Sequence, residues 1–450
     1  MRRHSIIARL GPVDKAKLDI KDTGSVQTTI RFIDGEKKLA YGLGQLIDAL
    51  VRRGVMPSET AVDLSILSAI ITAADTRISR ATESQDSWTR EIDLYLPVKD
   101  AALFEPHTAF ISQILAFLTG DRWRIFVRPR PKEYANLVEK KQLAVASFDS
   151  VCLFSGGLDS FIGAIDLLDA RRNPLFISHY WENSTSSQEI CAQRIGAVYG
   201  DMDPRHVRAR IGFNNQLVKG SDSETTTRGR SFLFLSMAVL AASGLANPDI
   251  VVPENGLISL NVPLDPLRLG AWSTRTTHPF YLARWQELLD RLGIPGTIVN
   301  PYRFQTKGEM VKACRNQTLL KKYAAETISC SSISKGRWKK LSKGHCGHCT
   351  PCLIRRSALL IGLGKDDTGY ALANLNGIKM NAKSAESEHI RSFQLMTARL
   401  KNEPGIEAAL IYKPGPLRDY PPADVARYGA VFKRGVEEVA MVISKVTVEP

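Results

Sequence analysis

The chain has 450 residues, of which 44% are hydrophobic and 24% are charged, as in average soluble globular proteins. This composition excludes a disordered chain, a collagen and a disulfide scaffold, and the length favours two or three domains. Lysine and arginine exceed aspartate and glutamate by 14, which favours anionic partners such as nucleotides, nucleic acid or an acidic protein. The longest apolar run, Phe232 to Ala246, is shorter than the roughly 20 residues of a membrane span and predicts a buried core helix.

The first 145 residues predict a separate α+β domain. Short alternating runs such as Gln27 to Ile33 are typical of strands, and Leu43 to Arg52 has the apolar period of a helix. The apolar stretch after Arg2 and Arg3 is too short for a secretory signal, so a cytoplasmic protein without a membrane partner is expected. The segment RWRIFVRPRPK, Arg122 to Lys132, alternates until its prolines end the strand, which places the linker just beyond it.

Residues 146–365 predict an α/β domain built on a parallel sheet. Their apolar runs lack alternation and are separated by segments of helix length, which is the pattern of strands buried on both faces. These runs are Val151 to Phe154, Pro174 to Tyr180, Val207 to Ile211, Ile250 to Pro253 and Thr297 to Asn300. Residues 366–450 carry no strand signal and predict a helical C-terminal extension.

The strongest motif is SGGLDS, which follows the first of these apolar runs and precedes a helical pattern. Gly156 and Gly157 permit close backbone approach to a ligand, and the free N–H groups at a helix start bind phosphate. Ser155 and Ser160 supply hydroxyl donors, and the Asp159 carboxylate suits magnesium. The alternative is an ordinary Gly-Gly turn with Asp159 as a helix cap.

Four of the seven cysteines are closely spaced, in the pattern C-x15-C-x2-C-x2-C. Thiolates at this spacing can form a tetrahedral zinc site, and we expect the ligands to be Cys330, Cys346, Cys349 and Cys352. An iron–sulfur cluster and unliganded thiols are the alternatives. Other candidate ligands are His345, His348 and Cys314.

The SGGLDS segment resembles the SGGxDS loop of the PP-loop ATP pyrophosphatases, which cleave ATP between its α and β phosphates. Together with the segment CGHCTPC that begins at Cys346, it resembles 7-cyano-7-deazaguanine synthase, the QueC family, over roughly Ser150 to Leu363. Arg230 in RSFLFLS and Lys307 in TKGE match further parts of that family. The resemblance implies an adenine nucleotide alpha hydrolase-like core that uses ATP, Mg²⁺ and Zn²⁺.

The resemblance also implies roles for single residues. Asp159, Lys307 and Arg230 would be catalytic contacts, although the two cations also suit solvated charges at helix starts. The residues that bind the nucleotide would be Ser155, Gly156, Gly157, Leu158, Asp159 and Ser160.

The chain departs from the family where substrate would bind. Ser231 replaces the usual Asn, and the segments Glu254 to Leu260 and Ser273 to Pro279 differ from the family's pattern. Candidate substrate-binding residues in these segments are Asn255, Arg275 and His278, the last two of which can equally cap the following helix. The long N-terminal and C-terminal parts resemble the QueC-like component of bacterial anti-phage operons, particularly the Qat system.

The family reaction implies that a 7-carboxy-7-deazaguanine-like carboxylate is adenylated by ATP, with release of pyrophosphate. An amine would then give an amide, which the family's enzyme dehydrates to a nitrile with a second ATP, or a conjugate with a partner protein from the same defence operon. Two alternatives remain: a tRNA-modifying PP-loop enzyme, and a nucleotide-binding, non-catalytic scaffold of a defence complex. The RNA alternative rests on the net charge and on two basic segments with aromatic residues, Arg122 to Lys132 and Lys335 to Lys343. The first segment can equally be a core strand, and the second a solvated loop.

Overall fold

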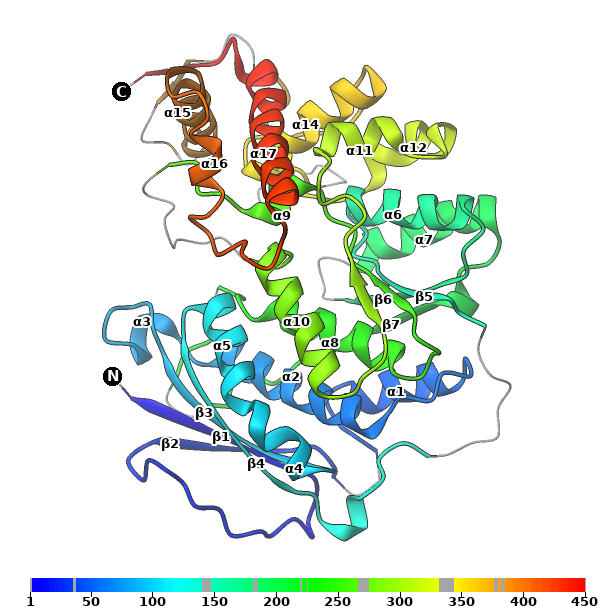
Figure 1. Ribbon diagram of the computed structural model, residues 1–450, viewed down its shortest axis with the longest axis vertical. Coiled ribbons are helices and arrows are strands. Elements are labelled where there is room, and N and C mark those ends of the chain that lie inside the picture. The colour runs from blue at the N-terminus through cyan, green and yellow to red at the C-terminus, as the bar shows by residue number, and fades with distance from the viewer. Residues whose placement is uncertain are drawn as a thin grey trace.

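Two parallel sheets with their helices make up the first two thirds of the chain, and helices make up most of the remainder (Figure 1). The computed structural model describes residues 2–34, 38–139, 147–180, 185–218, 221–224, 226–265, 275–331, 344–375, 379–381, 384 and 386–449. The fold is therefore a mixed α/β fold with parallel sheets.

The N-terminal sheet has the strand order β2-β1-β3-β4, and every neighbouring pair is parallel. Its strands are β1 (Arg3–Arg9), β2 (Val26–Arg31), β3 (Glu91–Val98) and β4 (Arg122–Pro129). The alternating runs in the sequence do not predict this parallel pairing. The alternation in the sequence arises because apolar side chains of the strands belong to the core, whereas polar side chains between them do not. One of these, Asp93 on β3, is covered by ion pairs with Arg3 and Arg124.

Helices α1 to α5 belong to the N-terminal part of the chain, and α1 packs against β7 (His206–Ala209) of the second sheet. The long helix α2 packs against β1 and β3, and α5 packs against β4. Their bounds are α1 (Leu43–Val51), α2 (Glu59–Arg77), α3 (Arg80–Glu83), α4 (Ala101–Phe104) and α5 (Thr108–Thr119). By length and composition alone, the stretch Ala101–Thr119 is apolar enough to cross a membrane. In the fold it is α4, a 3-10 turn and α5, and Ile111 and Leu115 of α5 belong to the protein core.

The second sheet confirms the parallel sheet predicted from the apolar runs. Its strands are β5 (Ser150–Leu153), β6 (Pro174–His179), β7 (His206–Ala209), β8 (Asp249–Val251) and β9 (Thr297–Val299). All neighbours are parallel, in the order β7-β6-β5-β8-β9. The strand order reverses between β5 and β8, and ligands of open α/β sheets bind beyond the carboxyl ends of the strands at such a point.

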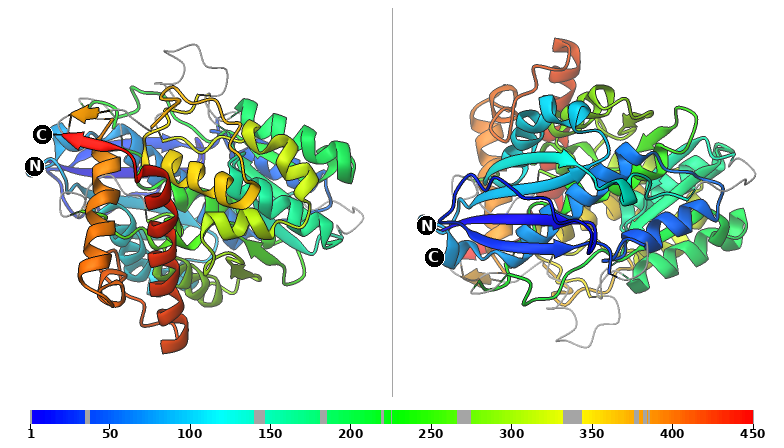
Figure 2. Two further views of the ribbon diagram at one scale, coloured as in Figure 1. Left: turned by 90° about the horizontal axis from the view of Figure 1, so that it is seen from above. Right: turned by 90° about the horizontal axis from the view of Figure 1, so that it is seen from below.

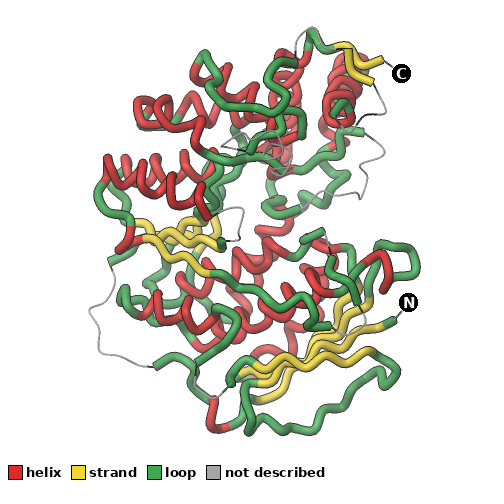
Figure 3. The backbone as a smooth tube through the Cα atoms, turned by 180° about the vertical axis from the view of Figure 1, so that it is seen from behind, coloured by secondary structure: helices red, strands yellow, loops and turns green. Residues whose placement is uncertain are grey.

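Helices cover both faces of this second sheet (Figures 1 and 3). Val151 of β5 joins the core that contains α8 and α10, whereas Cys152 joins the core that contains α6 and α7. This alternation is why both residues of one strand can be apolar. The four helices are α6 (Leu158–Asp169), α7 (Thr185–Tyr199), α8 (Arg230–Ala242) and α10 (Pro279–Arg291).

One hydrophobic core spans the two sheets. Helix α2 packs on α8, and buried residues from Ile6 to Ile294 belong to the same cluster. Helix α8 is the buried helix predicted from the longest apolar run. Residues 140–146, at the predicted boundary between the first two parts, lie outside the described residues.

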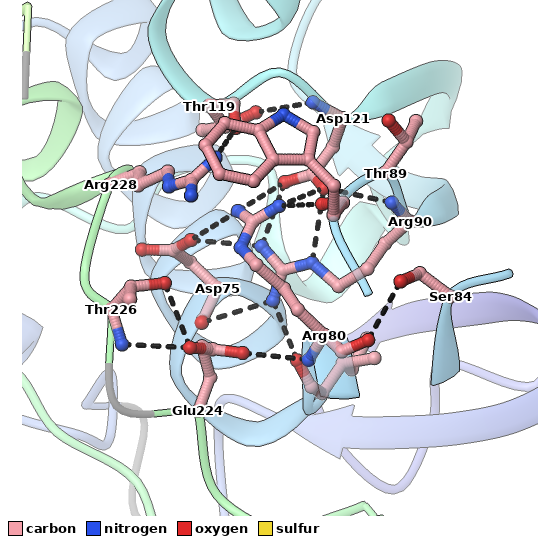
Figure 4. Close-up of polar contacts among 12 residues, drawn as sticks. Asp75, Arg80, Ser84, Thr89, Arg90, Thr119, Asp121, Glu224, Thr226 and Arg228 are labelled. Carbon is pink, nitrogen blue, oxygen red and sulfur yellow. Dashed lines mark hydrogen bonds and ion pairs between the residues drawn. The ribbon is translucent and has the colours of Figure 1, made fainter. Parts of the chain in front are cut away.

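A buried network of charges also joins the N-terminal part to the second sheet (Figure 4). The Arg90 guanidinium lies 2.7 Å from Asp121 Oδ2 and 3.0 Å from Asp75 Oδ1. Arg80 pairs with the same Asp121 at 2.6 Å. Asp75 Oδ2 accepts the N–H of Gly229 at 2.7 Å, directly before α8. The network therefore fixes the start of α8 against α2.

The C-terminal extension is mainly helical, but it also contains two short strands, which the sequence did not predict. Helix α17 packs against α9, α14, α15 and α16, and Figure 2 shows α15 and α17 side by side. The small sheet pairs β10 with β11. The remaining helices and strands are α9 (Gly256–Leu260), α11 (Lys307–Ala313), α12 (Gln317–Tyr323), α14 (Thr350–Leu363), α15 (Glu388–Asn402), α16 (Glu407–Leu410), α17 (Pro422–Ile443), β10 (Lys379–Asn381) and β11 (Thr447–Glu449).

Candidate functional site

The SGGLDS loop connects β5 to α6, beside the point where the strand order reverses. Gly156 has φ of 77°, and a Cβ atom there would lie 2.8 Å from the backbone nitrogen of Gln188. The Ser155 and Ser160 hydroxyls lie 3.1 Å apart, and the Gly157 N–H donates to Ser155 Oγ at 3.3 Å. Leu158 is buried in the core, so only its backbone can contact a ligand.

Asp159 does not cap α6, because the N-cap residue is Gly157 and no side chain caps that helix. Its Oδ1 atom lies 3.0 Å from the ammonium of Lys307. Its Oδ2 atom accepts hydrogen bonds from the Asn255 side chain at 2.7 Å and from the Asn255 backbone at 3.2 Å. Three residues that the sequence singled out separately therefore lie together.

Each of these side chains is held by a different element. Asp159 lies in the first turn of α6, and Lys307 is the first residue of α11. Asn255 follows β8 and caps α9, where its Oδ1 accepts the Ile258 N–H at 3.1 Å. Asp159, Asn255 and Lys307 are all buried, so they form a preorganised polar group beyond the carboxyl ends of β5 and β8.

Glu254 is a fourth member of this group that the site prediction missed. Its Oε1 accepts a hydrogen bond from the Asn255 side chain at 3.1 Å. Burial raises the pKa of Glu254 well above its ordinary value, and the neighbouring Asp159 carboxylate raises it further. A carboxylate directly after the apolar run of β8, beside the reversal of strand order, was the signal available in the sequence.

The pKa of Asp159 is shifted in the opposite direction. Burial alone would raise its pKa, but the charge of Lys307 and the hydrogen bonds from Glu254 and Asn255 hold that pKa below its ordinary value. The pKa values of the two carboxyls are therefore shifted in opposite directions, so that Asp159 loses its proton at a lower pH than Glu254 does. Carboxylate oxygens suit a divalent cation, and the nearby ammonium suits phosphate.

Arg230, predicted as a catalytic contact, lies in a neighbouring cavity of about 250 Å³. This cavity lies between α2, the first turn of α8 and the ends of β6 and β7, and its walls include His179, Phe213 and Leu233. Burial lowers the pKa of His179 to about 4, so its ring is neutral at pH 7. Among the described residues, the Arg230 guanidinium makes no ion pair; it lies 5.0 Å from the centre of the Phe234 ring.

Arg275 and His278, predicted to bind substrate, both make contacts within the fold. Arg275 Nη1 donates to the Phe117 carbonyl at 2.8 Å, and its guanidinium lies over the Phe117 ring. His278 is fully buried, and its Nδ1 accepts the Phe280 N–H at the start of α10. The helix-cap alternative therefore describes His278, and Arg275 anchors this region to α5. Residues 273 and 274 of that segment lie outside the described residues.

The four predicted cysteines come together in one buried cluster. All four sulfurs lie within 4.8 Å of one another, and the pairs Cys330–Cys349 and Cys346–Cys352 are each 3.9 Å apart. A tetrahedral ion with metal–sulfur bonds of about 2.3 Å needs sulfurs about 3.8 Å apart. The donor set therefore fits a single metal ion such as zinc.

The other candidate ligands lie outside this cluster. His345 Nε2 accepts the Ser329 N–H at 3.3 Å, and Cys314 follows α11 in the core around α6. His348 is buried but is not among the clustered donors.

The cysteine cluster lies next to the SGGLDS loop. The Ile328 N–H, two residues before Cys330, donates to the Gly156 carbonyl at 3.1 Å. The fully buried Arg355 of α14 donates to Thr327 Oγ1 at 2.8 Å and to the Ala324 carbonyl at 2.6 Å. The segment that supplies the first cysteine therefore also supports the back of the loop.

The basic segment Arg122 to Lys132 is neutralised within the fold. The Trp123 indole is buried and donates to Thr119 Oγ1 at 2.9 Å. Phe126 stacks on Tyr95. The arginines of this segment form the ion pairs Arg122–Glu91, Arg124–Asp93, Arg128–Asp14 and Arg130–Asp63. The second basic segment, 335–343, lies outside the described residues.

Comparison of the chain with protein-family models, with curated proteins and with solved structures finds no match.

Proposed function

We propose that this chain is an ATP-dependent enzyme of the PP-loop type that adenylates a carboxylate and releases pyrophosphate. The observation that carries this proposal is the group of Asp159, Asn255 and Lys307 beside the SGGLDS loop, at the reversal of strand order in a parallel sheet. Open α/β sheets bind nucleotides at this position, and the group offers both a cation for phosphate and carboxylate oxygen for magnesium.

In this proposal the loop binds the departing pyrophosphate. The N–H groups of the loop and the hydroxyls of Ser155 and Ser160 would donate to phosphate oxygens. Asp159 would hold Mg²⁺, which would neutralise charge on the phosphates. Lys307 would leave its ion pair with Asp159 to contact the phosphates. Positioning and charge stabilisation then supply the catalysis, and no protein nucleophile is needed.

The substrate would be a planar heterocycle with a carboxylate, as the resemblance to 7-cyano-7-deazaguanine synthase implies. A carboxylate oxygen attacks the α phosphorus, and the bond to the bridging oxygen of the β phosphate breaks. An amine then attacks the acyl adenylate, so that a C–N bond forms, AMP leaves and the amine proton passes to solvent. The cavity beside Arg230 suits such a substrate, because its lining combines apolar side chains such as Phe213 and Leu233 with the Arg230 guanidinium, which makes no ion pair with any described residue.

The acceptor would be ammonia or an amine of a partner protein of the same anti-phage operon. Ammonia would give an amide, which a second ATP could activate for loss of water to a nitrile, and a protein amine would give a conjugate. Zinc at the four cysteines would be structural, because four protein ligands leave no open position for substrate. The RNA-modifying alternative loses support, since the arginines of its first basic segment are already paired.

The test combines the purified protein with ATP, Mg²⁺ and 7-carboxy-7-deazaguanine, with and without an amine or the operon's partner proteins. Formation of AMP and pyrophosphate that depends on the carboxylate supports the proposal, and the product mass distinguishes a nitrile, an amide and a protein conjugate. Asp159→Asn should abolish turnover, whereas Asp169→Asn, at an exposed position of the same helix, should not. Absence of AMP with all partners present contradicts the proposal, and ATP binding under those conditions favours the scaffold.

A further inference from the structure

The C-terminal helix α17 reaches the residues on both sides of Lys307. Glu438 of α17 accepts the hydroxyl of Thr306 through Oε1 and the N–H of Gly308 through Oε2, the latter at 3.2 Å. These two donors come directly before and after the lysine that pairs with Asp159. No sequence motif pointed to this contact, which joins positions 130 residues apart.

Gly308 is required for so close an approach. A Cβ atom at this position would lie 2.6 Å from Glu438 Oε1. Burial raises the pKa of Glu438, while the hydrogen bonds from Thr306 and Gly308 oppose that rise. The charge of Glu309 raises the pKa of Glu438 further, and the charge of Arg434 lowers it.

A second contact from α17 supports the same turn. Arg434 Nε donates to Glu309 Oε1 at 2.7 Å, and Glu309 Oε2 accepts the N–H of Thr306 at 2.9 Å. Helix α11 has only seven residues, too few to be stable without contacts from the rest of the fold. The first turn of α11 is therefore held by α17, in addition to the capping box that Thr306 and Glu309 form and the packing of α11 on α14.

We propose that Glu438 is a positioning residue, which fixes the first turn of α11 so that the Lys307 ammonium lies beside Asp159. The C-terminal extension is then part of the functional site, although its own side chains do not contact the reacting groups. The catalytic consequence rests on the proposed function, whereas the effect on Lys307 does not.

The test measures the reactivity of Lys307 directly. Ligand-free protein is treated with an amine-acylating reagent, and acylation of Lys307 is followed by peptide mass spectrometry. Glu438→Ala removes two hydrogen bonds to the first turn of α11 and should increase the rate of Lys307 acylation at least about fivefold, which is the effect of losing the net contribution of one such bond. Glu438→Gln keeps an acceptor oxygen and should restore most of the protection. Glu437→Gln, at the adjacent exposed position of α17, should match the wild type.

In the adenylation assay, Glu438→Ala should lower kcat for AMP formation, and Glu438→Gln should recover most of it. Circular dichroism first establishes that each variant is folded. Wild-type reactivity of Lys307 in a folded Glu438→Ala protein would overturn the inference. If the wild type forms no AMP, the proposed enzyme activity fails, but the acylation rates still decide the role of Glu438.

Discussion

At the scale of single residues, Glu254 and Asp159 carry the pH response of the site. The pKa of Glu254 is raised well above the ordinary value of 4.5, chiefly by burial and then by the Asp159 carboxylate. As the pH rises past about 4.5, the unfolded chain releases this proton before the folded chain does. The contribution of Glu254 to stability is therefore full at low pH and is lost as the pH rises through its folded pKa.

We expect Glu254→Gln to remove this loss, because glutamine cannot ionise. The variant should be more stable than the wild type at about pH 8, and the difference should shrink toward about pH 5. Urea unfolding across this range in metal-free buffer measures the effect. A difference in the free energy of unfolding that does not vary with pH would contradict the assigned ionisation.

Cys349 offers a second prediction at this scale. The purified protein should contain about one zinc ion per chain, and Cys349→Ser should reduce that content to near zero, because its sulfur is one of the four donors. Metal analysis by mass spectrometry measures both. Cys314→Ala is the matched control, since this buried cysteine lies outside the cluster. Equal zinc loss in the control would show that the cluster does not hold the metal.

At the scale of elements, the turn between β5 and α6 depends on Gly156. Alanine at a positive φ costs roughly 1–2 kcal/mol, and at Gly156 its Cβ would also lie 2.8 Å from Gln188 N and Ser187 Oγ of α7. Overpacking of this kind adds about 1–3 kcal/mol. Gly156→Ala should therefore lower the free energy of unfolding more than Gly200→Ala.

Gly200 is a suitable control because its φ is 91° and a Cβ atom there would have no heavy atom within 4 Å. Urea unfolding compares the two variants, and titration with Mg-ATP tests the loop itself. Only Gly156→Ala should weaken nucleotide binding. Equal effects of both substitutions on stability would mean that the close approach of α7 does not constrain the loop.

The elements also show what a sequence can and cannot predict. The strands β5 to β9 were predictable because strands buried on both faces leave continuous apolar runs. The direction of strand pairing in the N-terminal sheet was not predictable, because the alternation of apolar and polar residues along one strand does not depend on whether its neighbour is parallel.

The site was predictable in part. The loop and the four cysteines follow local spacing, and Asp159, Asn255 and Lys307 indeed lie together. The roles of Arg275 and His278 could not be assigned from residue type alone. Arg275 donates to a backbone carbonyl and His278 accepts an N–H at a helix start, and the same side chains could hydrogen-bond a substrate. Glu438 was missed because its role depends on the packing of α17 alone.

At the scale of the whole molecule, we expect the two sheets to unfold together. Their apolar residues share one cluster through α2 and α8, so separating them would expose both helices to water. Native-state hydrogen exchange in increasing urea should give the slowest amides of β3 and β5 the same free energy of opening within about 1 kcal/mol. Opening of β3 several kcal/mol below β5 would instead identify an independent N-terminal domain.

The buried arginine–aspartate network between these parts gives the molecule an unusual temperature dependence. Arg80 and Arg90 with Asp75 and Asp121 lie almost entirely out of water. The hydration lost by such charges becomes less favourable as temperature rises, so the penalty for burying them falls on heating. Apolar contacts, in contrast, weaken on cooling. Asp75 of this network accepts the Gly229 N–H directly before α8, and α2 packs on α8 within the shared apolar core. The association of α2 with the start of α8 is therefore least secure in the cold, where the apolar contact and the network that holds Asp75 are both weaker.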